Sequence, residues 1–326
     1  MRVAFWGTPE FATPPLHALL GEGHDVVAVV TQPDRPQGRS RSVLVPSPVK
    51  AIAIANGIPV FQPEKPRGDD FVHALRETRP DINVVVAYGR LLPQAVIDLP
   101  PRGTINIHGS ILPKLRGAAP IEAAILAGET ETGVTIMRMV LALDAGPAIH
   151  VLRTPILADE TGGELRERLS ELGAQALIEA LALMEVGAAR ETPQNDAEAT
   201  FCERITREDA RVDWTASAVR VSRVIRAYDP KPAAFTNHGP VEVKLFGCRL
   251  ERFMIEFADI RPERSEGPAP SGAVPGTVLD VNADGIAVAC GSDSVRISAV
   301  LPAGRKRLSA RDWAAGRGVS VGDVLG

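Results

Sequence analysis

Two polar side chains with complementary chemistry lie two residues apart at the end of a short β-rich run. Thr104 to His108 is followed by Gly109, so this run should be a strand whose last residues emerge at a loop. Residues two apart on a strand share a face, so Asn106 and His108 should point the same way. A carboxamide and an imidazole aimed at one spot can stabilise an oxyanion that develops in a tetrahedral transition state.

Asp144 can add a carboxylate to the same spot. It follows a second β-like run, Gly133 to Met139, and is followed by Ala145-Gly146-Pro147. A carboxylate beside an imidazole fixes its tautomer and favours its charged form. We therefore predict that Asn106, His108 and Asp144 form one catalytic site, and that its chemistry is acyl-type transfer.

Each of these residues also has a purely structural interpretation. A histidine that ends a strand is often a satisfied structural residue, an aspartate before Ala-Gly-Pro often forms a turn, and an asparagine can cap a strand end. A serine hydrolase would use Ser110, His108 and Asp144, but the sequence lacks the Gly-x-Ser-x-Gly elbow and Ser110 is too close to His108 along the chain. A metal site lacks an obvious third ligand.

The composition sets broad limits on the class of protein. Of 326 residues, 45% are hydrophobic and 23% are charged, which suffices for two domains with cores of their own. The first residues lead directly into a strand pattern without a signal peptide, and no window approaches the roughly 20 apolar residues of a membrane span. We therefore expect a cytoplasmic protein. Three widely spaced cysteines, Cys202, Cys248 and Cys290, fit neither a disulfide framework nor a Cys-x-x-Cys metal site.

The first half of the chain alternates strands and helices. Val3–Trp6 and Val26–Thr31 should be strands on either side of a helix that has Thr13 as N-cap and Pro14 at its first position. This order predicts a Rossmann-like, doubly wound parallel sheet. Neither Gly-x-Gly-x-x-Gly nor Gly-Lys-Ser/Thr is present, so dinucleotide and triphosphate binding have no motif. Further helices are expected over 48–56, 69–78, 120–127 and 161–186, and strands over 59–61, 82–86 and 148–155.

The pattern of predicted elements changes from Ile205 onward. A helix over 216–228 is followed by short strand patterns over 241–246, 250–255, 276–281, 285–289 and 295–300. Several short strands with glycine turns predict a small antiparallel, OB-like barrel, with residues 259–273 as an insertion. We predict domains over 1–189 and 205–326, joined by a linker over 190–204. Residues 1–206 hold 19 Lys and Arg against 25 Asp and Glu, whereas 207–326 hold 17 against 15. The mildly basic second half allows local contact with RNA phosphates.

A Ser-x-Leu-Pro turn and a Gly-Ala-x-Pro helix start stand between the two parts of the predicted site. They are Ser110-Ile111-Leu112-Pro113 and Gly117-Ala118-Ala119-Pro120. With Asn106-x-His108 and Asp144-x-Gly146, these motifs resemble the shared site of the folate-dependent formyltransferases. The resemblance implies catalytic roles for the three site residues, 10-formyltetrahydrofolate as the formyl donor, an amine as the acceptor, and no metal.

The resemblance also indicates which residues bind the folate donor. Four belong to the turn and three to the loop after the predicted strand 82–86, namely Ser110, Ile111, Leu112 and Pro113, with Tyr88, Gly89 and Leu91. The loop would line the pterin pocket with backbone and apolar side chains. Tyr88 and Leu91 could equally be core residues.

Residues 32–47 form a long polar loop that is rich in arginine. On charge alone, a solvated loop is an equal interpretation. The runs 34–39 and 46–50 resemble the insertion by which family members that act on methionyl-tRNA hold the acceptor end of initiator tRNA. The tRNA-binding residues predicted on this basis are Arg35, Arg39, Arg41 and Lys50. Residues 40–43 depart from the family pattern by one additional residue.

The resemblance covers nearly the whole chain, and the C-terminal barrel of such family members binds tRNA. It implies transfer of a formyl group to the α-amino group of methionine on initiator methionyl-tRNA. By analogy with the family, we expect the enzyme to be a monomer. A formyltransferase for a nucleotide-sugar or a glycinamide nucleotide would share the three site residues, but the arginine-rich loop and the barrel disfavour it. A catalytically silent RNA-binding protein is disfavoured because all three site residues are present.

Overall fold

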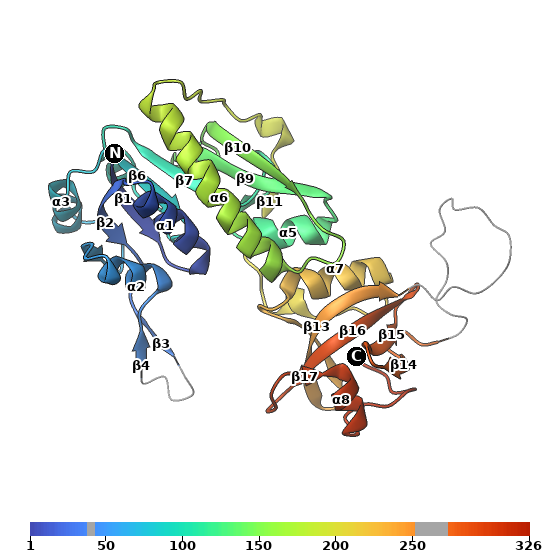
Figure 1. The fold of residues 1–326 in the computed structure, drawn as a ribbon. Coiled ribbons are helices and arrows are strands. Elements are labelled where there is room, and N and C mark those ends of the chain that lie inside the picture. The colour runs from blue at the N-terminus through green and yellow to red at the C-terminus, as the bar shows by residue number, and fades with distance from the viewer. Residues whose placement is uncertain (38–42, 252–272) are drawn as a thin grey trace. The chain divides into compact units, whose positions relative to one another are not determined.

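The chain divides into two compact units in the computed structural model, which describes residues 1–37, 43–251 and 273–326. The first unit contains Met1–Pro120, Glu131–Pro155 and Arg166–Glu203. The second contains Ile121–Thr130, Ile156–Leu165 and Arg204–Gly326 (Figure 1). Most of the segment predicted as a linker is thus part of the first unit.

A seven-stranded sheet in the order β10-β9-β7-β6-β1-β2-β5 forms the centre of the first unit. The five strands from β7 to β5 run parallel, as the doubly wound prediction required. The sheet differs from the prediction at one edge, where β9 pairs antiparallel with both β7 and β10. The strand bounds are β1 Arg2–Gly7, β2 Asp25–Val30, β5 Val60–Phe61, β6 Ile82–Val86, β7 Thr104–His108, β9 Glu131–Arg138 and β10 Ala148–Pro155.

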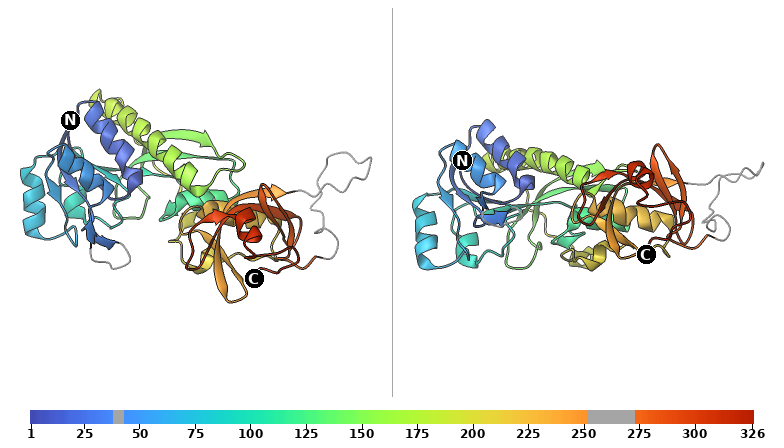
Figure 2. Two further views of the ribbon diagram at one scale, coloured as in Figure 1. Left: turned by 60° about the horizontal axis from the view of Figure 1, so that its bottom comes forward. Right: turned by 90° about the horizontal axis from the view of Figure 1, so that it is seen from below.

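Helices and short elements complete the first unit. The helices are α1 Thr13–Gly21, α2 Pro48–Ala55, α3 Asp69–Glu77, α4 Gln94–Ile97 and α6 Gly162–Glu185. In both Figure 1 and Figure 2, α1 lies beside the part of α6 that belongs to this unit. The N-cap of α2 is Ser47, whose hydroxyl accepts from the backbone N–H of Lys50, whereas the predicted cap of α1, Thr13, is already helical and Ala12 takes the cap position. The remaining elements are the hairpin β3 Arg35–Gln37 and β4 Val43–Val45, the pair β8 Arg116–Gly117 and β11 Phe201–Cys202, and 3-10 turns over 10–12 and 196–198.

A buried carboxamide joins three elements of this core. The Asn83 side chain on β6 accepts a hydrogen bond from Trp6 Nε1 at 3.1 Å. It donates to the carbonyl of Val96 at 2.9 Å and to the hydroxyl of Thr104 at 3.1 Å. Buried polar groups are costly unless paired, so this residue satisfies groups on β1, α4 and β7 together.

Replacement of Asn83 by alanine is expected to lower the free energy of unfolding by about 3 kcal/mol, because it leaves the buried N–H of Trp6 without a partner, removes two further hydrogen bonds and opens a cavity. Denaturant titration of the whole chain measures this change. Asn56→Ala is the matched control, since Asn56 is exposed and its amide bonds the carbonyl of Ile52 at a helix end. The control should lose less than about 1 kcal/mol. Equal losses in the two variants would contradict the role given to Asn83.

The second unit is built on an antiparallel sheet of six strands, in the order β12-β13-β16-β15-β14 with β17 paired to β16. Its core buries Trp214 and Trp313 among aliphatic residues from the sheet, α7 and α8. The bounds are α5 Pro120–Ala127, α7 Ala218–Tyr228, β12 Ala234–His238, β13 Val241–Glu251, β14 Val278–Asn282, β15 Gly285–Ala289, β16 Ser294–Pro302, β17 Leu308–Ser309 and α8 Ala310–Ala315, with a 3-10 turn over 208–210.

Two features of this unit differ from the sequence prediction. β13 continues through Gly247, where two separate strands were expected, and β12 and α8 were not predicted at all. Residues 252–255 of the second expected strand, and residues 259–272 of the expected insertion, lie outside the described residues. Among the helices of the described ranges, none is long and apolar enough to cross a membrane.

Candidate active site

The strand β7 presents Asn106 and His108 on one face, and its bounds agree with the prediction. In the sheet, Asn106 lies opposite Val85 of β6 and Met137 of β9, and His108 lies opposite Thr135. β6 and β7 run parallel, so the two polar residues approach the carboxyl edge of the parallel strands. Ligands of open α/β sheets usually bind at that edge.

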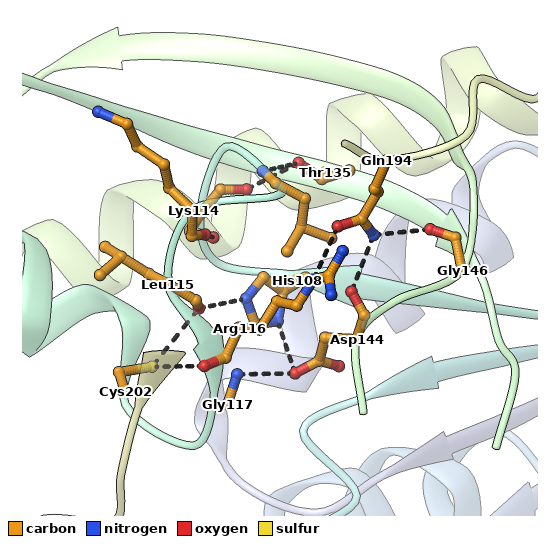
Figure 3. A network of polar contacts seen from close by, with 12 residues as sticks. His108, Lys114, Leu115, Arg116, Gly117, Thr135, Asp144, Gly146, Gln194 and Cys202 are labelled. Carbon is orange, nitrogen blue, oxygen red and sulfur yellow. Dashed lines mark hydrogen bonds and ion pairs between the residues drawn. The ribbon is translucent and has the colours of Figure 1, made fainter. Parts of the chain in front are cut away.

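His108 is held between a backbone carbonyl and Asp144 (Figure 3). Its Nε2 lies 2.9 Å from the carbonyl oxygen of Leu115, and its Nδ1 lies 3.7 Å from Asp144 Oδ2. A carbonyl oxygen can only accept, so Nε2 carries a proton and Nδ1 is the nitrogen that can gain or lose one. The two side chains are 6% and 13% exposed, which keeps this pair largely out of bulk water.

Asp144 is held by its backbone as well as by its carboxylate. Its φ is +49°, a left-handed conformation that aspartate adopts more readily than most residues. The backbone N–H of Gly117 donates to Asp144 Oδ2 at 2.9 Å, and the Gln194 side chain donates to the Asp144 carbonyl at 2.8 Å. Such conformations persist where the surroundings fix them, and they concentrate at functional sites.

The short pair of strands β8 and β11 shapes the loop that binds both residues. Gly117 lies at φ +123°, and a Cβ there would stand 2.1 Å from the carbonyl oxygen of Cys202. The N–H of Leu115 donates to the hydroxyl of Thr200 at 2.8 Å. Loop 115–117 therefore supplies the acceptor for His108 and the donor for Asp144 from positions two residues apart.

The carboxamide of Asn106 is half-buried. Within residues 1–37, 43–251 and 273–326 it makes no side-chain hydrogen bond, so its donors remain available to a ligand. The predicted pair on β7 therefore combines a firmly held imidazole with a free amide. A carbonyl oxygen that gains negative charge needs donors arranged in this way before the reaction begins.

Comparison with known proteins agrees with this geometry. A family model described as formyl transferase matches residues 1–181, and one described as formyl transferase, C-terminal domain, matches residues 204–318. A methionyl-tRNA formyltransferase from Chromobacterium violaceum is 43% identical over 327 residues, which cover 100% of this chain and 100% of that protein. The chain belongs to the formyl transferase family.

Solved structures share the fold of this family at lower identity. HypX from Aquifex aeolicus in complex with tetrahydrofolic acid has a TM-score of 0.66 at 21% identity. The match covers 96% of this chain, which spans 46% of the length of HypX. An N-formyltransferase from Helicobacter canadensis, in complex with folinic acid and dTDP-3-aminofucose, also has a TM-score of 0.66, at 17% identity over 91% of this chain and 99% of that one.

The turn that the family resemblance assigns to folate binding is firmly fixed. Ser110 Oγ donates to the carbonyl of Lys114 at 2.6 Å. Thr135 Oγ1 donates to the carbonyl of Ser110 at 2.7 Å and accepts from the N–H of Leu112 at 3.1 Å. Ser110 is 1% exposed, and neither nitrogen of His108 contacts it. This arrangement disfavours the alternative in which Ser110 is a nucleophile.

The second group of predicted folate residues separates into buried and exposed side chains. Tyr88 is 2% exposed and packs edge-to-face on Trp6 at 5.2 Å, so its ring belongs to the core. Burial raises the pKa of Tyr88 to about 12. Leu91 is 77% exposed, and Gly89 has φ +84°. A contact of Tyr88 with a ligand would have to come from its backbone, whose carbonyl already accepts from Gln32 Nε2 at 3.1 Å.

Two of the four predicted tRNA-binding residues can be placed. Arg35 is exposed on β3, whereas Arg39 and Arg41 lie outside the described residues. Lys50 Nζ lies 2.6 Å from Asp34 Oδ2 and 2.8 Å from Gln62 Oε1, at the base of the β3–β4 hairpin. Asp34 also accepts a hydrogen bond from Gln62 Nε2 at 2.7 Å, and the bonds from Lys50 and then from Gln62 lower the pKa of Asp34. Lys50 thus anchors the hairpin, and its role toward tRNA stays a prediction.

Sequence reasoning missed three exposed apolar side chains immediately before Asp144. Val140, Leu141 and Leu143 are 39%, 65% and 53% exposed. Their signal was visible in the sequence, because large apolar residues in a short loop between strands have little core to join. Exposed apolar surface beside a polar site is typical of ligand pockets. Among the residues that the structure describes, no group of three or more His, Cys, Asp or Glu side chains could hold a metal ion.

Proposed function

We propose that this chain transfers the formyl group of 10-formyltetrahydrofolate to the α-amino group of methionine on initiator methionyl-tRNA. The product is N-formylmethionyl-tRNA, which serves translation initiation. The observation that carries the proposal is full-length similarity, at 43% identity, to a methionyl-tRNA formyltransferase. The arrangement of Asn106, His108 and Asp144 supports it with chemistry suited to acyl transfer.

The proposed reaction needs a polarised carbonyl and a route for one proton. The amine nitrogen attacks the formyl carbon and forms a C–N bond, while a π electron pair moves to the oxygen. Collapse of the tetrahedral intermediate breaks the bond to N10 of the folate, which takes a proton as the amine loses one. No covalent bond to the enzyme is required.

The three site residues divide this work. The carboxamide of Asn106 and a proton on Nδ1 of His108 would donate to the developing oxyanion. Asp144 would stabilise the positive charge on His108 and, directly or through a water molecule, help remove the proton of the attacking amine. The remaining acceleration would come from holding two large substrates in contact, which removes much of the entropic barrier.

The substrate contacts follow from exposed groups on each unit. The turn 110–113 and the exposed apolar loop 140–143 flank the site and would hold the folate ring. Arg35 on the first unit is an exposed cation for the tRNA. On the second unit, Arg305, Lys306 and Arg307 are exposed, and the Arg307 guanidinium lies 4.1 Å from the centre of the Phe246 ring. Phe246 is itself buried, so the cations of this cluster are the groups that would bind RNA, through its phosphates.

Formyl transfer from 10-formyltetrahydrofolate to methionyl initiator tRNA is the direct test, with methionyl elongator tRNA as the matched control. We expect rapid transfer to the initiator and transfer slower by at least about 10²-fold to the elongator, which corresponds to about 3 kcal/mol of discrimination. Transfer to neither tRNA, with folate still bound, would move the acceptor to a small amine such as an amino sugar. Equal transfer to both tRNAs would show that the enzyme does not distinguish the initiator from the elongator, and that part of the proposal would be wrong.

Three predictions accompany the proposed function: the location, the oligomeric state and the roles of the domains. A cytoplasmic location and a monomeric state stay predictions. The domain division at 1–189, 190–204 and 205–326 is likewise proposed as functional, with catalysis in the first part and tRNA binding in the last.

A further inference from the structure

The segment that follows α6 lies between the two family models, which match residues 1–181 and 204–318. Sequence reasoning treated most of it as a polar linker. In the structure it belongs to the first compact unit and passes beside the site. Figure 3 shows Gln194 of this segment pointing between the loop that binds His108 and the loop that carries Asp144.

Gln194 uses both ends of its carboxamide. Its Nε2 donates to the carbonyl of Asp144 at 2.8 Å and to the carbonyl of Gly146 at 2.6 Å. Its Oε1 accepts from Nε of Arg116 at 3.0 Å. Two donors and one acceptor are therefore engaged, so the amide orientation follows from its partners: carbonyls require the nitrogen end and a guanidinium requires the oxygen end.

Arg116 gives this contact its rigidity. Its side chain is 5% exposed, and its guanidinium bonds Asp196 at 2.7 Å in addition to Gln194. Its backbone N–H donates to the carbonyl of Thr200 at 2.9 Å. A buried cation must keep its partners, because an unpaired one is strongly destabilising. Arg116 also directly precedes Gly117, the residue whose N–H binds the Asp144 carboxylate.

We propose that Gln194 is a positioning residue that sets the separation between His108 and Asp144, an inference that rests on the proposed formyl transfer. The chain of contacts Arg116–Gln194–Asp144 joins the two loops from the side of the backbone. These contacts hold the backbone of Asp144 in its left-handed conformation, and the Asp144 carboxylate lies 3.7 Å from Nδ1 of His108. Gln194 itself acts through Asp144 and touches no reacting atom.

The first test compares Gln194→Met with Gln194→Glu. Met removes all three hydrogen bonds at similar volume, whereas Glu keeps the acceptor for Arg116 and removes both donors. We expect kcat to fall by about 10²-fold in both variants, since a shift of about 1 Å in a catalytic group can cost that much. KM for both substrates should stay within about twofold, because the substrate-binding groups remain in place. Thermal unfolding confirms that each variant is folded.

The matched control is Glu191→Gln in the same segment. The Glu191 carboxylate pairs with Arg138, at 3.1 Å from Nε, and contacts none of the site residues. Its kcat should stay within about twofold of wild type. A loss equal to that of Gln194→Met would show that the segment acts only through general stability, and would overturn the inference.

A double-mutant cycle separates positioning from a merely structural role. If Gln194 acts through Asp144, then Gln194→Met in an Asp144→Asn background should lower kcat by no more than about twofold further. If Gln194→Met lowered kcat by the same factor in the Asp144→Asn background as in wild type, the proposal would be contradicted. It would also be contradicted if the wild type were active and neither Gln194→Met nor Gln194→Glu changed kcat. Failure of the wild type to transfer formyl at all would instead contradict the proposed function.

Discussion

Replacement of His108 by alanine is expected to lower the rate of formyl transfer by about 10³-fold. The imidazole provides a donor, the proton on Nδ1, for the oxyanion, and loss of one such donor typically costs about 10²- to 10³-fold. Single-turnover transfer from bound 10-formyltetrahydrofolate to methionyl initiator tRNA measures this step without product release. Folate binding should be little changed, because the turn 110–113 is held by Thr135 and by its own backbone.

His150→Ala is the matched control for this variant. His150 lies on β10, and its Nε2 lies 2.6 Å from Glu179 Oε2. Neither residue of this pair belongs to the site. This is a largely surface pair, which contributes little to stability, so the transfer rate should stay within about twofold of wild type. If His108→Ala retained the wild-type rate of transfer, the assignment of the site to the end of β7 would be wrong.

The parts of the fold that depend on local pattern were predictable. The strand bounds of β6, β7 and β10 agree with the prediction, because each is an apolar or β-rich run that ends at a clear boundary. The placement of Asn106 and His108 on one face follows from the period of two along any strand. That part of the site needed no tertiary information.

The parts that depend on contacts distant in sequence were not predictable. Gln194 and Arg116 are 78 positions apart, and no local pattern indicates that a polar linker returns to the site. The antiparallel direction of β9 depends on pairing with β7, and the left-handed φ of Asp144 depends on the loop around it. Local preference is a weak guide wherever tertiary partners decide the conformation.

Tyr88 has two interpretations from the sequence. The family resemblance places its loop in the folate pocket, and a core position is an equal alternative. Its ring packs against Trp6 in a core that also contains Leu75 and Val96, so a contact with folate would come from its backbone. The direction of a side chain at the end of a strand depends on the next turn, and Ala87, with φ +47°, leaves the strand conformation directly before Tyr88.

Replacement of Gly117 by alanine has the second large expected effect, and it acts on both stability and catalysis. The new Cβ would stand 2.1 Å from the carbonyl oxygen of Cys202, in a backbone conformation that L-residues rarely adopt. Strain and overpacking together should lower the free energy of unfolding by about 3 kcal/mol. Relief of the clash would separate β8 from β11 and move the N–H of Gly117 away from Asp144. We expect kcat to fall by about 10²-fold, measured at a temperature where the variant is folded.

Gly57→Ala separates the two effects, because it tests backbone strain without a clash or a nearby site. Gly57 has φ +67°, and a Cβ there would meet nothing within 4 Å. This control should lose about 1 kcal/mol of stability and keep its wild-type kcat. If Gly117→Ala lost stability alone and kept its kcat, then the N–H that reaches Asp144 would be dispensable. The carboxylate would then have to be held beside His108 by other contacts, of which the hydrogen bond from Gln194 to the Asp144 carbonyl is the strongest candidate.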